Sequence, residues 1–245
     1  MWHARLARLT ALLLCAAASR IWASLLRKQQ QLGAYGLGGP LLVPVLHDLD
    51  AAWASAVYSA LPPRVRACTV SFRHARASDA LRELCAAAAA DPTSSLLEVG
   101  ASTICSEEQV WAAKKSGATF ISTMYFSPRI VEVAAAAQIP VLGGVMNHAE
   151  ARTTIDSGVD SLKFYPSSTV SPLSLTLILE QLGMDTVKDR DIIVAGGLTE
   201  DDFQKYLAAG ATGFAVGIDC KSLPDSSKAI TAKLNLLFDQ LSEFQ

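Results

Sequence analysis

From Pro40 onward, the chain alternates short β-branched apolar runs with Ala- and Leu-rich segments of helical periodicity. This alternation is typical of strand–helix units around a parallel sheet, and eight such units can be counted. The predicted strands are Leu41–Leu46, Ala67–Arg73, Leu96–Ala101, Ala118–Ser122, Ile139–Gly143, Ser161–Tyr165, Asp191–Ala195 and Thr212–Gly217. The predicted helices are Asp48–Leu61, Ser78–Ala90, Ser106–Ser116, Ser127–Ala137, His148–Gly158, Ser171–Leu182, Thr199–Ala209 and Ser226–Glu243.

Eight consecutive units predict an α/β fold, a (β/α)8 TIM barrel, for residues 36–245. The alternative is a doubly wound parallel sheet, because a count of strands does not show that the sheet closes. Gly117, Gly158 and Gly210 follow predicted helices, where a left-handed residue commonly ends a helix. In a barrel, the C-terminal ends of the strands are the positions where catalytic residues are expected.

Residues 1–35 form a leader of different character, with five basic side chains and no acidic one. Its apolar octet Ala11–Ala18 is too short to span a bilayer. An acid-free segment with apolar residues at helical spacing predicts a transit peptide for a mitochondrion or plastid. A secretory or bipartite signal, or a leader without function on a cytoplasmic protein, are the alternatives. Gly33–Pro40 is interpreted as a flexible join.

Composition narrows the possible partners. Apolar residues make up 51% of the 245, which excludes a disordered chain, and the net charge is −2. Without the leader, 16 basic residues face 23 acidic ones, so neither nucleic acid nor an acidic membrane surface is an expected partner. The five cysteines form no CxxC pair and are interpreted as buried free thiols in a reducing compartment.

A single lysine, Lys163, lies within the predicted sixth strand, and Pro166 follows it. A charged ammonium in a packed barrel interior is costly, so the group tends to lose its proton, and a neutral amine attacks a ketone to give a Schiff base. Arg73, at the end of the second strand, is expected to lower the lysine pKa further as a second cation. It also offers a fork for a substrate carboxylate. The alternative is a lysine that reaches the rim or pairs with a Glu.

The strands carry segments that together resemble one family of barrel enzymes, the class I 2-keto-3-deoxy-6-phosphogluconate and 4-hydroxy-2-oxoglutarate aldolases. The resemblance covers about Pro40 to Gly217. The segments are Val43-Pro44-Val45, Val70-Ser71-Phe72-Arg73, Val99-Gly100-Ala101-Ser102-Thr103, Ile139-Pro140-Val141-Leu142-Gly143-Gly144-Val145, Leu162-Lys163-Phe164-Tyr165-Pro166 and Ala195-Gly196-Gly197-Leu198.

The resemblance implies cleavage of a 2-keto-4-hydroxy acid, the small-molecule substrate, into pyruvate and an aldehyde through a lysine imine. It assigns Lys163 as the imine former and Arg73 as the ligand of the pyruvyl carboxylate, and it adds a hydroxyl contact from Thr103. Phe164 is either an apolar wall beside the lysine or plain core. The substrate-binding residues implied further are Gly143 and, as an amide cradle for phosphate at the start of the seventh helix, Gly196 and Gly197. No cofactor is implied, and a homo-oligomer, a trimer, is expected.

The sequence departs from the family pattern at the general acid/base. The family has a Glu four residues before the Arg of the second strand, and Thr69 stands there. Proton transfer of this kind is typically worth about 10²–10⁴ in rate, so a substitute is expected. The two candidates are His47, after the first strand, and Glu98, on the third strand if its side chain faces inward.

The phosphate end departs as well. Ala195 replaces a hydroxyl residue, and Asp219 stands in place of a serine on the eighth strand, where a carboxylate is expected to repel phosphate. After the fourth strand, Thr123-Met124-Tyr125 replaces Ser-Pro-Gly. A 6-phosphorylated substrate is therefore a weaker expectation than the imine.

Three other functions stay open. A degenerate barrel that binds a keto acid or a protein fits the departures from the pattern. Another phosphate-binding barrel enzyme, such as an isomerase, rests on Gly196 and Gly197 alone. A metal-dependent aldolase is disfavoured and no metal site is predicted, because the four histidines show no ligand spacing with carboxylates.

Overall fold

The computed structural model describes residues 40–91, 97–159, 161–199, 201–221 and 226–242. The predicted leader 1–35, and with it Cys15, lies outside these residues. No helix within the described ranges is both long and apolar enough to cross a membrane.

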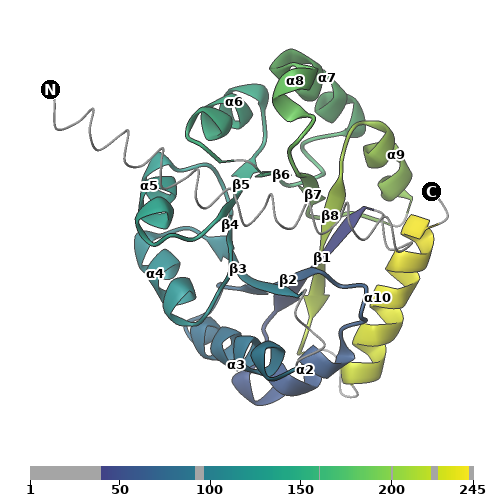
Figure 1. Ribbon diagram of the computed structural model, residues 1–245. Coiled ribbons are helices and arrows are strands. Elements are labelled where there is room, and N and C mark those ends of the chain that lie inside the picture. The colour runs from purple at the N-terminus through teal and green to yellow at the C-terminus, as the bar shows by residue number, and fades with distance from the viewer. Residues whose placement is uncertain (1–39, 92–96, 160, 200, 222–225, 243–245) are drawn as a thin grey trace, which may run out of the picture.

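Eight parallel strands close into a barrel in the order β1 to β8, as Figure 1 shows. Closure is made by β1 and β8, which pair along seven residues, from Leu41 with Gly213 to His47 with Asp219. The strands are β1 Leu41–His47, β2 Ala67–Ser71, β3 Glu98–Ile104, β4 Ile121–Thr123, β5 Val141–Val145, β6 Ser161–Phe164, β7 Ile192–Ala195 and β8 Gly213–Asp219. The prediction of a (β/α)8 barrel is confirmed, and the doubly wound sheet is excluded.

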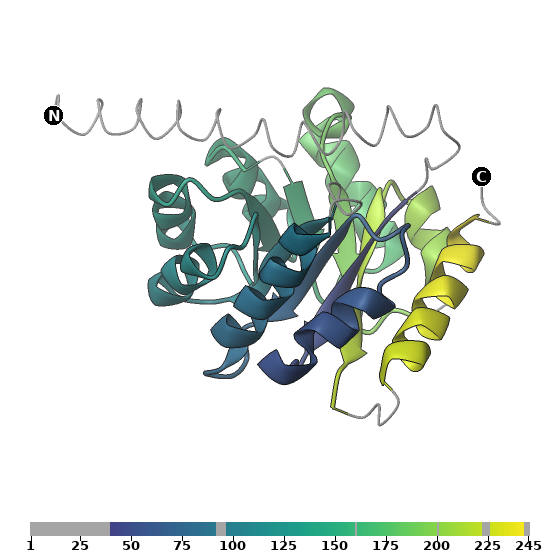
Figure 2. The same cartoon turned by 60° about the horizontal axis from the view of Figure 1, so that its bottom comes forward.

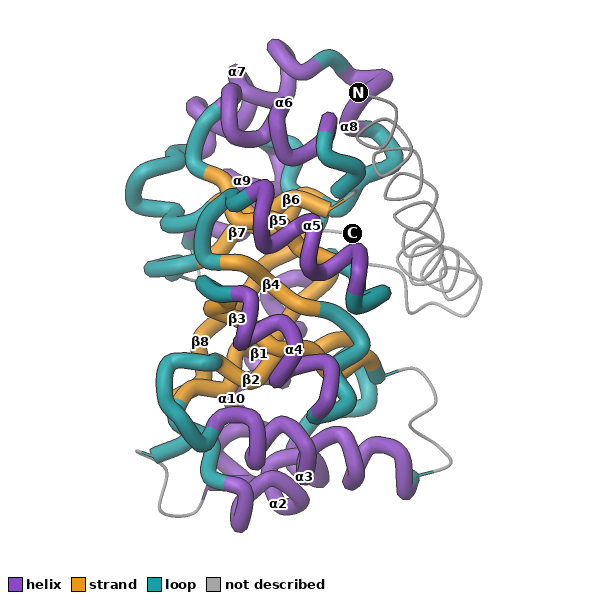
Figure 3. The backbone as a smooth tube through the Cα atoms, turned by 90° about the vertical axis from the view of Figure 1, so that its left-hand side faces the viewer, coloured by secondary structure: helices purple, strands orange, loops and turns teal. Residues whose placement is uncertain are grey.

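The helices form an outer layer around the strands (Figures 2 and 3). They are η1 Ala51–Trp53, α2 Ala54–Ala60, α3 Ala77–Ala90, α4 Glu107–Lys115, α5 Pro128–Ala136, α6 His148–Asp156, α7 Pro172–Leu182, α8 Met184–Val187, α9 Asp202–Ala208 and α10 Ser226–Ser242. Each predicted helix is present. The first is shorter than predicted, because Asp48 has a left-handed backbone (φ 52°) and the Asp50 carboxylate caps η1. The short α8 is not apparent from the apolar pattern.

The glycines predicted at helix ends are confirmed, and a side chain caps the start of one helix. Ser106 caps α4 by accepting a hydrogen bond from the Gln109 amide at 3.3 Å. Gly117, Gly158 and Gly210 have φ values of 93°, 83° and 100°, which are the left-handed conformations expected at the ends of helices.

One apolar layer lies outside the ring of strands and another lies inside it. The larger one fills the space between strands and helices, and a smaller one fills the barrel. Successive side chains of a strand point to opposite faces, so each strand supplies both layers. The inner layer consists of Val43, Ala67, Phe120, Leu142, Ile193, Ala195 and Ala215. The Phe120 ring lies where a side chain at Gly100 would stand, with a Cβ there only 2.7 Å from the ring.

The cysteines are free thiols in the described part, but only partly buried. Cys68 is buried, Cys85 and Cys220 are half-buried, and Cys105 is exposed. The expectation that all are buried is therefore wrong for Cys105, which follows β3 on the surface loop before α4.

Barrel closure depends on a close approach of Gly213 to β1, which gives the first prediction. A Cβ at Gly213 would lie 2.8 Å from the Leu41 Cβ and closer still to its carbonyl oxygen. We expect Gly213→Ala to lower the free energy of unfolding by about 1–3 kcal/mol, the usual range for overpacking. Urea denaturation measures this. Leu173→Ala, at a position 70% exposed, is the control, with an expected change within about 0.5 kcal/mol. Equal midpoints for the two variants would contradict the prediction.

Candidate active site

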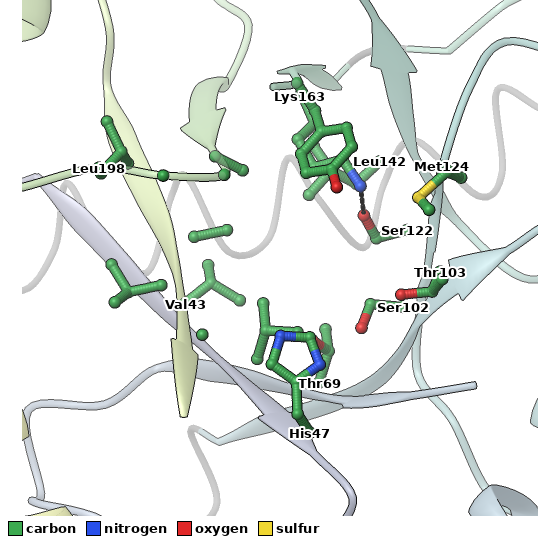
Figure 4. A pocket seen from close by; sticks show the side chains of 18 of the residues that line it. Val43, His47, Thr69, Ser102, Thr103, Ser122, Met124, Leu142, Lys163 and Leu198 are labelled. Carbon is green, nitrogen blue, oxygen red and sulfur yellow. Dashed lines mark hydrogen bonds between the residues drawn. The ribbon is translucent and has the colours of Figure 1, made fainter. Parts of the chain in front are cut away.

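A cavity of about 520 Å³ opens at the C-terminal ends of the strands, where barrel enzymes bind their substrates. All eight strands or the residues directly after them line it, and α9 and α10 add a few side chains. Figure 4 shows the labelled residues around it, with Lys163 and Ser122 on one side and His47 on the other. The cavity therefore joins residues that are far apart in the sequence.

Lys163 points into this cavity from β6 and is only 7% exposed. Its Nζ donates to the Ser122 hydroxyl at 2.9 Å and to the Thr123 carbonyl oxygen at 2.7 Å. The Nζ also lies 5.5 Å from the centre of the Tyr165 ring. Lys163 forms no ion pair with any carboxylate of the described ranges. The prediction of an inward lysine is thus confirmed, and the rim and Glu-pair alternatives are excluded.

Burial lowers the pKa of Lys163 to about 8, and the nearby Cys105 opposes this shift. At that pKa, about one tenth of the amine is neutral at pH 7, against less than one in a thousand for an ordinary lysine. The expected contribution of Arg73 to this shift is not found. Its charge lowers the pKa of His47 instead.

Arg73 and Thr103 both line the cavity, as predicted. Arg73 is exposed and makes no ion pair with any described residue, so its guanidinium fork is available to an anion. Thr103 has a left-handed backbone (φ 64°) at a register shift between β3 and β4. This bulge places its hydroxyl 3.0 Å from that of Ser71, at the cavity wall.

His47 is the one predicted acid/base candidate that reaches the cavity. It ends β1 and lies beside Gly217, where a Cβ would be 3.1 Å from the His47 Nε2. Burial first and Arg73 second lower the pKa of His47, while Asp48 and Asp219 raise it. The imidazole is therefore held in its neutral form, which accepts protons, at neutral pH.

The prediction for Glu98 is wrong. Glu98 begins β3 and pairs with Ala67, the first residue of β2, so it lies at the N-terminal end of the barrel. By alternation it faces inward like Gly100 and Ser102, but at the end opposite the cavity. A general base must lie within reach of the substrate, and Glu98 does not.

Two of the expected substrate-binding residues, Phe164 and Gly143, face the helices and not the cavity. Phe164 is fully buried in the layer between strands and helices, so it is plain core and not a wall beside the lysine. Gly143 also faces outward, because a Cβ there would meet the Thr154 side chain of α6 at 2.7 Å. The inward neighbour Gly144 donates its amide to the Thr123 hydroxyl at 2.8 Å and so helps to place the carbonyl that holds Lys163.

Gly196 and Gly197 line the cavity, as predicted, with φ values of 86° and 79°. A Cβ at Gly196 would lie 2.6 Å from the Tyr165 ring, so only glycine fits there. The following helix α9 begins at Asp202 and not at Thr199, so the two glycines belong to a turn ahead of the helix. Asp219 does not line the cavity; its carboxylate accepts from the Lys221 amide at 2.9 Å.

Several lining residues were not identified from the sequence. Ser122 and Tyr165 lie at the ends of predicted strands, and this position could have identified them as residues of the site. Lys233 lies on the last helix, where no sequence pattern indicates a role in the site. The cavity is lined by three basic side chains, Arg73, Lys163 and Lys233, and among the described residues no Asp or Glu lines it. No group of His, Cys, Asp and Glu within these ranges is arranged to hold a metal ion.

Fold and site together define a (β/α)8 barrel with a buried lysine at the C-terminal end of its sixth strand. The chain belongs to the KDPG and KHG aldolase family, whose model it matches over residues 40–229.

Individual relatives agree with this. The chain is 29% identical over 119 residues to a probable 2-dehydro-3-deoxy-6-phosphogalactonate aldolase of Rhizobium meliloti, covering 49% of this chain and 54% of that protein. It therefore spans about half the length of this relative. A solved structure described as native KDPGal matches with a TM-score of 0.70 at 19% identity, over 82% of this chain and 96% of that one.

A further solved relative is a KDPG aldolase from Legionella pneumophila with pyruvate captured as a covalent carbinolamine. It matches with a TM-score of 0.61 at 17% identity, over 84% of this chain and 93% of that one. At these identities, the two solved structures show the fold alone.

The burial of Lys163 predicts an unusual reactivity of its amine. Because the neutral amine is the nucleophile, its acetylation by acetic anhydride should rise with pH around a midpoint of about 8. Competitive labelling over a pH series, read by peptide mass spectrometry, measures the midpoint. Lys163→Met identifies the peptide, since the labelled species must disappear. A midpoint above about 10, the ordinary range for lysine, would contradict the prediction.

The outward orientation of Phe164 gives a second prediction for this region. Phe164→Leu should lower the free energy of unfolding by about 1–3 kcal/mol, since it leaves a partial cavity beneath the helices. The pH midpoint of Lys163 labelling should not change, because the ring does not contact the cavity. A shifted midpoint in a folded variant would contradict the outward orientation and indicate that Phe164 lines the site.

Proposed function

We propose that this chain is a class I aldolase that cleaves a 2-keto-4-hydroxy acid, such as 4-hydroxy-2-oxoglutarate or 2-keto-3-deoxy-6-phosphogluconate, to pyruvate and an aldehyde. The observation that carries the proposal is the buried Lys163 amine in a cavity that no described Asp or Glu lines. Membership in the KDPG and KHG aldolase family supports it.

The first step is the binding of an acid substrate by the positively charged side chains of the cavity. Arg73 and Lys233 at the cavity attract an acid substrate, and the Arg73 guanidinium can donate two parallel hydrogen bonds to the carboxylate next to the keto group. Since no Asp or Glu among the described residues lines the cavity, the substrate supplies the negative charge that pairs with them. The apolar side chains Val43, Leu142 and Ala215 keep water from the reacting carbons.

The covalent steps centre on Lys163. The neutral amine attacks the keto carbon to give a carbinolamine, which loses water to form the protonated imine. When the C4 hydroxyl loses its proton, the C4=O bond of the aldehyde forms and the C3–C4 bond breaks. The electron pair of the broken bond forms C2=C3, and the C2=N pair moves onto the nitrogen. The aldehyde leaves, the resulting enamine takes a proton at C3, and water hydrolyses the imine to free pyruvate and Lys163.

The far end of the substrate, beyond C4, is an anion in this proposal. At the cavity wall, the turn of Gly196 and Gly197 and the positive charge of Lys233 are available to this anion. The Lys233 amine donates to the Gly217 carbonyl oxygen at 3.4 Å. Because Asp219 lies outside the lining, the repulsion of phosphate expected from it is weaker than the sequence suggests. Both a carboxylate and a phosphate satisfy this end.

One observation favours a second candidate function, a barrel that binds a keto acid without turning it over. Thr69 stands at the position of the family's carboxylate and no other carboxylate lines the cavity in the described part. Cleavage of 4-hydroxy-2-oxoglutarate that is abolished in Lys163→Met excludes this alternative.

Two earlier expectations remain predictions. The trimeric state rests on the resemblance, and the transit peptide rests on residues 1–35.

The proposal is tested by trapping the imine. Borohydride added with pyruvate should reduce the imine and fix one pyruvyl group on Lys163, because the cavity presents a neutral amine to the keto carbon. Intact-protein mass spectrometry and peptide mapping locate the adduct. Lys163→Met is the matched negative, and the exposed Lys115→Met should trap as the unchanged protein does. Recovery of unmodified Lys163, under conditions that modify a known class I aldolase, would overturn the proposal.

A further inference from the structure

Three buried polar atoms that lack a hydrogen-bond partner among the described residues belong to side chains of one cavity. They are His47 Nδ1, Thr69 Oγ1 and Ser102 Oγ. Thr69 is 1% exposed and Ser102 is 4% exposed. Native proteins seldom leave buried polar atoms unsatisfied, and such atoms commonly bind an ordered water or a ligand. Their concentration in the site therefore indicates a shared bound group.

The strand register brings these three side chains together. Thr69 of β2 pairs with Val45 of β1 and with Gly100 of β3. His47 and Ser102 lie two residues further along β1 and β3, so by alternation both face inward on either side of Thr69. Figure 4 shows the three labelled side chains on the same side of the pocket.

This wall faces the lysine. In a closed ring of eight strands, β2 and β6 are four strands apart in both directions, so Thr69 lies across the barrel from Lys163. A keto acid bound covalently to Lys163 would extend from β6 toward β2. Arg73, two residues after β2, would hold its carboxylate on the same side, so the C3 carbon next to the imine would lie in the space between Lys163 and this wall.

We propose that His47 is the proton-transfer residue of this site and that Thr69 and Ser102 position the water molecule that carries the proton between His47 and the substrate. The water takes the place in space of the family's carboxylate. This inference rests on the proposed function, because it needs the imine on Lys163.

The same proton path accounts for two reactions, the exchange of pyruvate protons and aldol cleavage. With bound pyruvate, the C3–H bond breaks, its electron pair forms C2=C3, and the iminium nitrogen takes up the displaced pair. The proton passes to the water, which gives one of its own protons to neutral His47. In aldol cleavage, the C4 hydroxyl is the first donor, and the imidazolium later returns that proton to C3 through the same water.

The charges around His47 suit a base. The charged groups that act on His47 are Arg73, the adjacent Asp48 and Asp219, its pairing partner on β8. Lys233 donates to the carbonyl oxygen of the neighbouring Gly217. Burial and Arg73 lower the pKa of His47, so the neutral, accepting form extends to a lower pH than for a free histidine. The rate that depends on this base should fall only below that pKa.

The experiment follows exchange of the methyl protons of pyruvate for deuterium in D₂O by proton NMR, with the full chain. Each rate is divided by the amount of imine that borohydride traps, so that binding and proton transfer are separated. His47→Gln should lower this ratio about 10²–10⁴-fold. Thr69→Val and Ser102→Ala should each lower it about five- to tenfold, the loss for one hydrogen bond to the water.

Two matched variants separate a proton relay from simple packing. Thr69→Ser keeps the hydroxyl and should retain exchange. Thr154→Val removes a buried hydroxyl from α6, outside the cavity, and should have no effect. In His47→Gln combined with Thr69→Glu, the new carboxylate should restore exchange, and the acid limb of the pH profile should move from that of a histidine to the lower pH of a carboxyl group.

The outcomes distinguish the relay from the proposed function. Wild-type exchange per trapped imine in His47→Gln would overturn the assignment of His47, and wild-type values in both Thr69→Val and Ser102→Ala would overturn the water site. Trapped pyruvate without exchange in the wild type would overturn the relay and leave the imine intact. Absence of any trapped pyruvate would overturn the proposed function and the relay with it.

Discussion

The structure depends on holding the Lys163 amine in a buried position, where its charged form is energetically unfavourable. Lys163 is only 7% exposed, and the two hydrogen-bond partners of its Nζ, the Ser122 hydroxyl and the Thr123 carbonyl, are neutral oxygens. Such partners accept hydrogen bonds without adding the negative charge that would fix the proton on the lysine. The result is a side chain that is positioned like a structural residue and yet is deprotonated often enough to react.

Strand alternation turns this single requirement into a constraint on the whole barrel. Lys163 faces the cavity because Leu162 and Phe164 face the helices, and both are fully buried there. A shift of one residue in the pairing of β6 with β5 and β7 would bury the lysine under α6 and α7 and place Phe164 in the barrel. The apolar neighbours of Lys163 therefore specify its chemistry, although neither touches the cavity.

The sequence allows prediction of whatever depends on local pattern. Eight units, the left-handed glycines and the inward lysine follow from periodicity and from one charged residue in an apolar run. The prediction for Glu98 fails because Glu98 is the first residue of β3, so it faces inward at the N-terminal end of the barrel, away from the cavity. The predictions for Phe164 and Gly143 fail because a place in a motif does not show on which face of the strand a residue lies. Lys233 and the unsatisfied hydroxyls of Thr69 and Ser102 require the closed barrel, since only closure brings α10, β2 and β3 to the same space.

The missing carboxylate changes the site in two opposed ways. A glutamate at position 69 would supply a strong base, but its negative charge would also stabilise the ammonium form of Lys163 and weaken the attraction of an acid substrate. Threonine removes that charge, so no carboxylate of the described lining opposes the attraction of Arg73 and Lys233 for an anion, and the amine stays easier to deprotonate. The cost falls on proton transfer, which passes from a carboxylate to an imidazole that is neutral before it accepts its proton. A substitution that looks like the loss of catalysis is therefore also a redistribution of charge, which favours binding and imine formation over the rate of the proton steps.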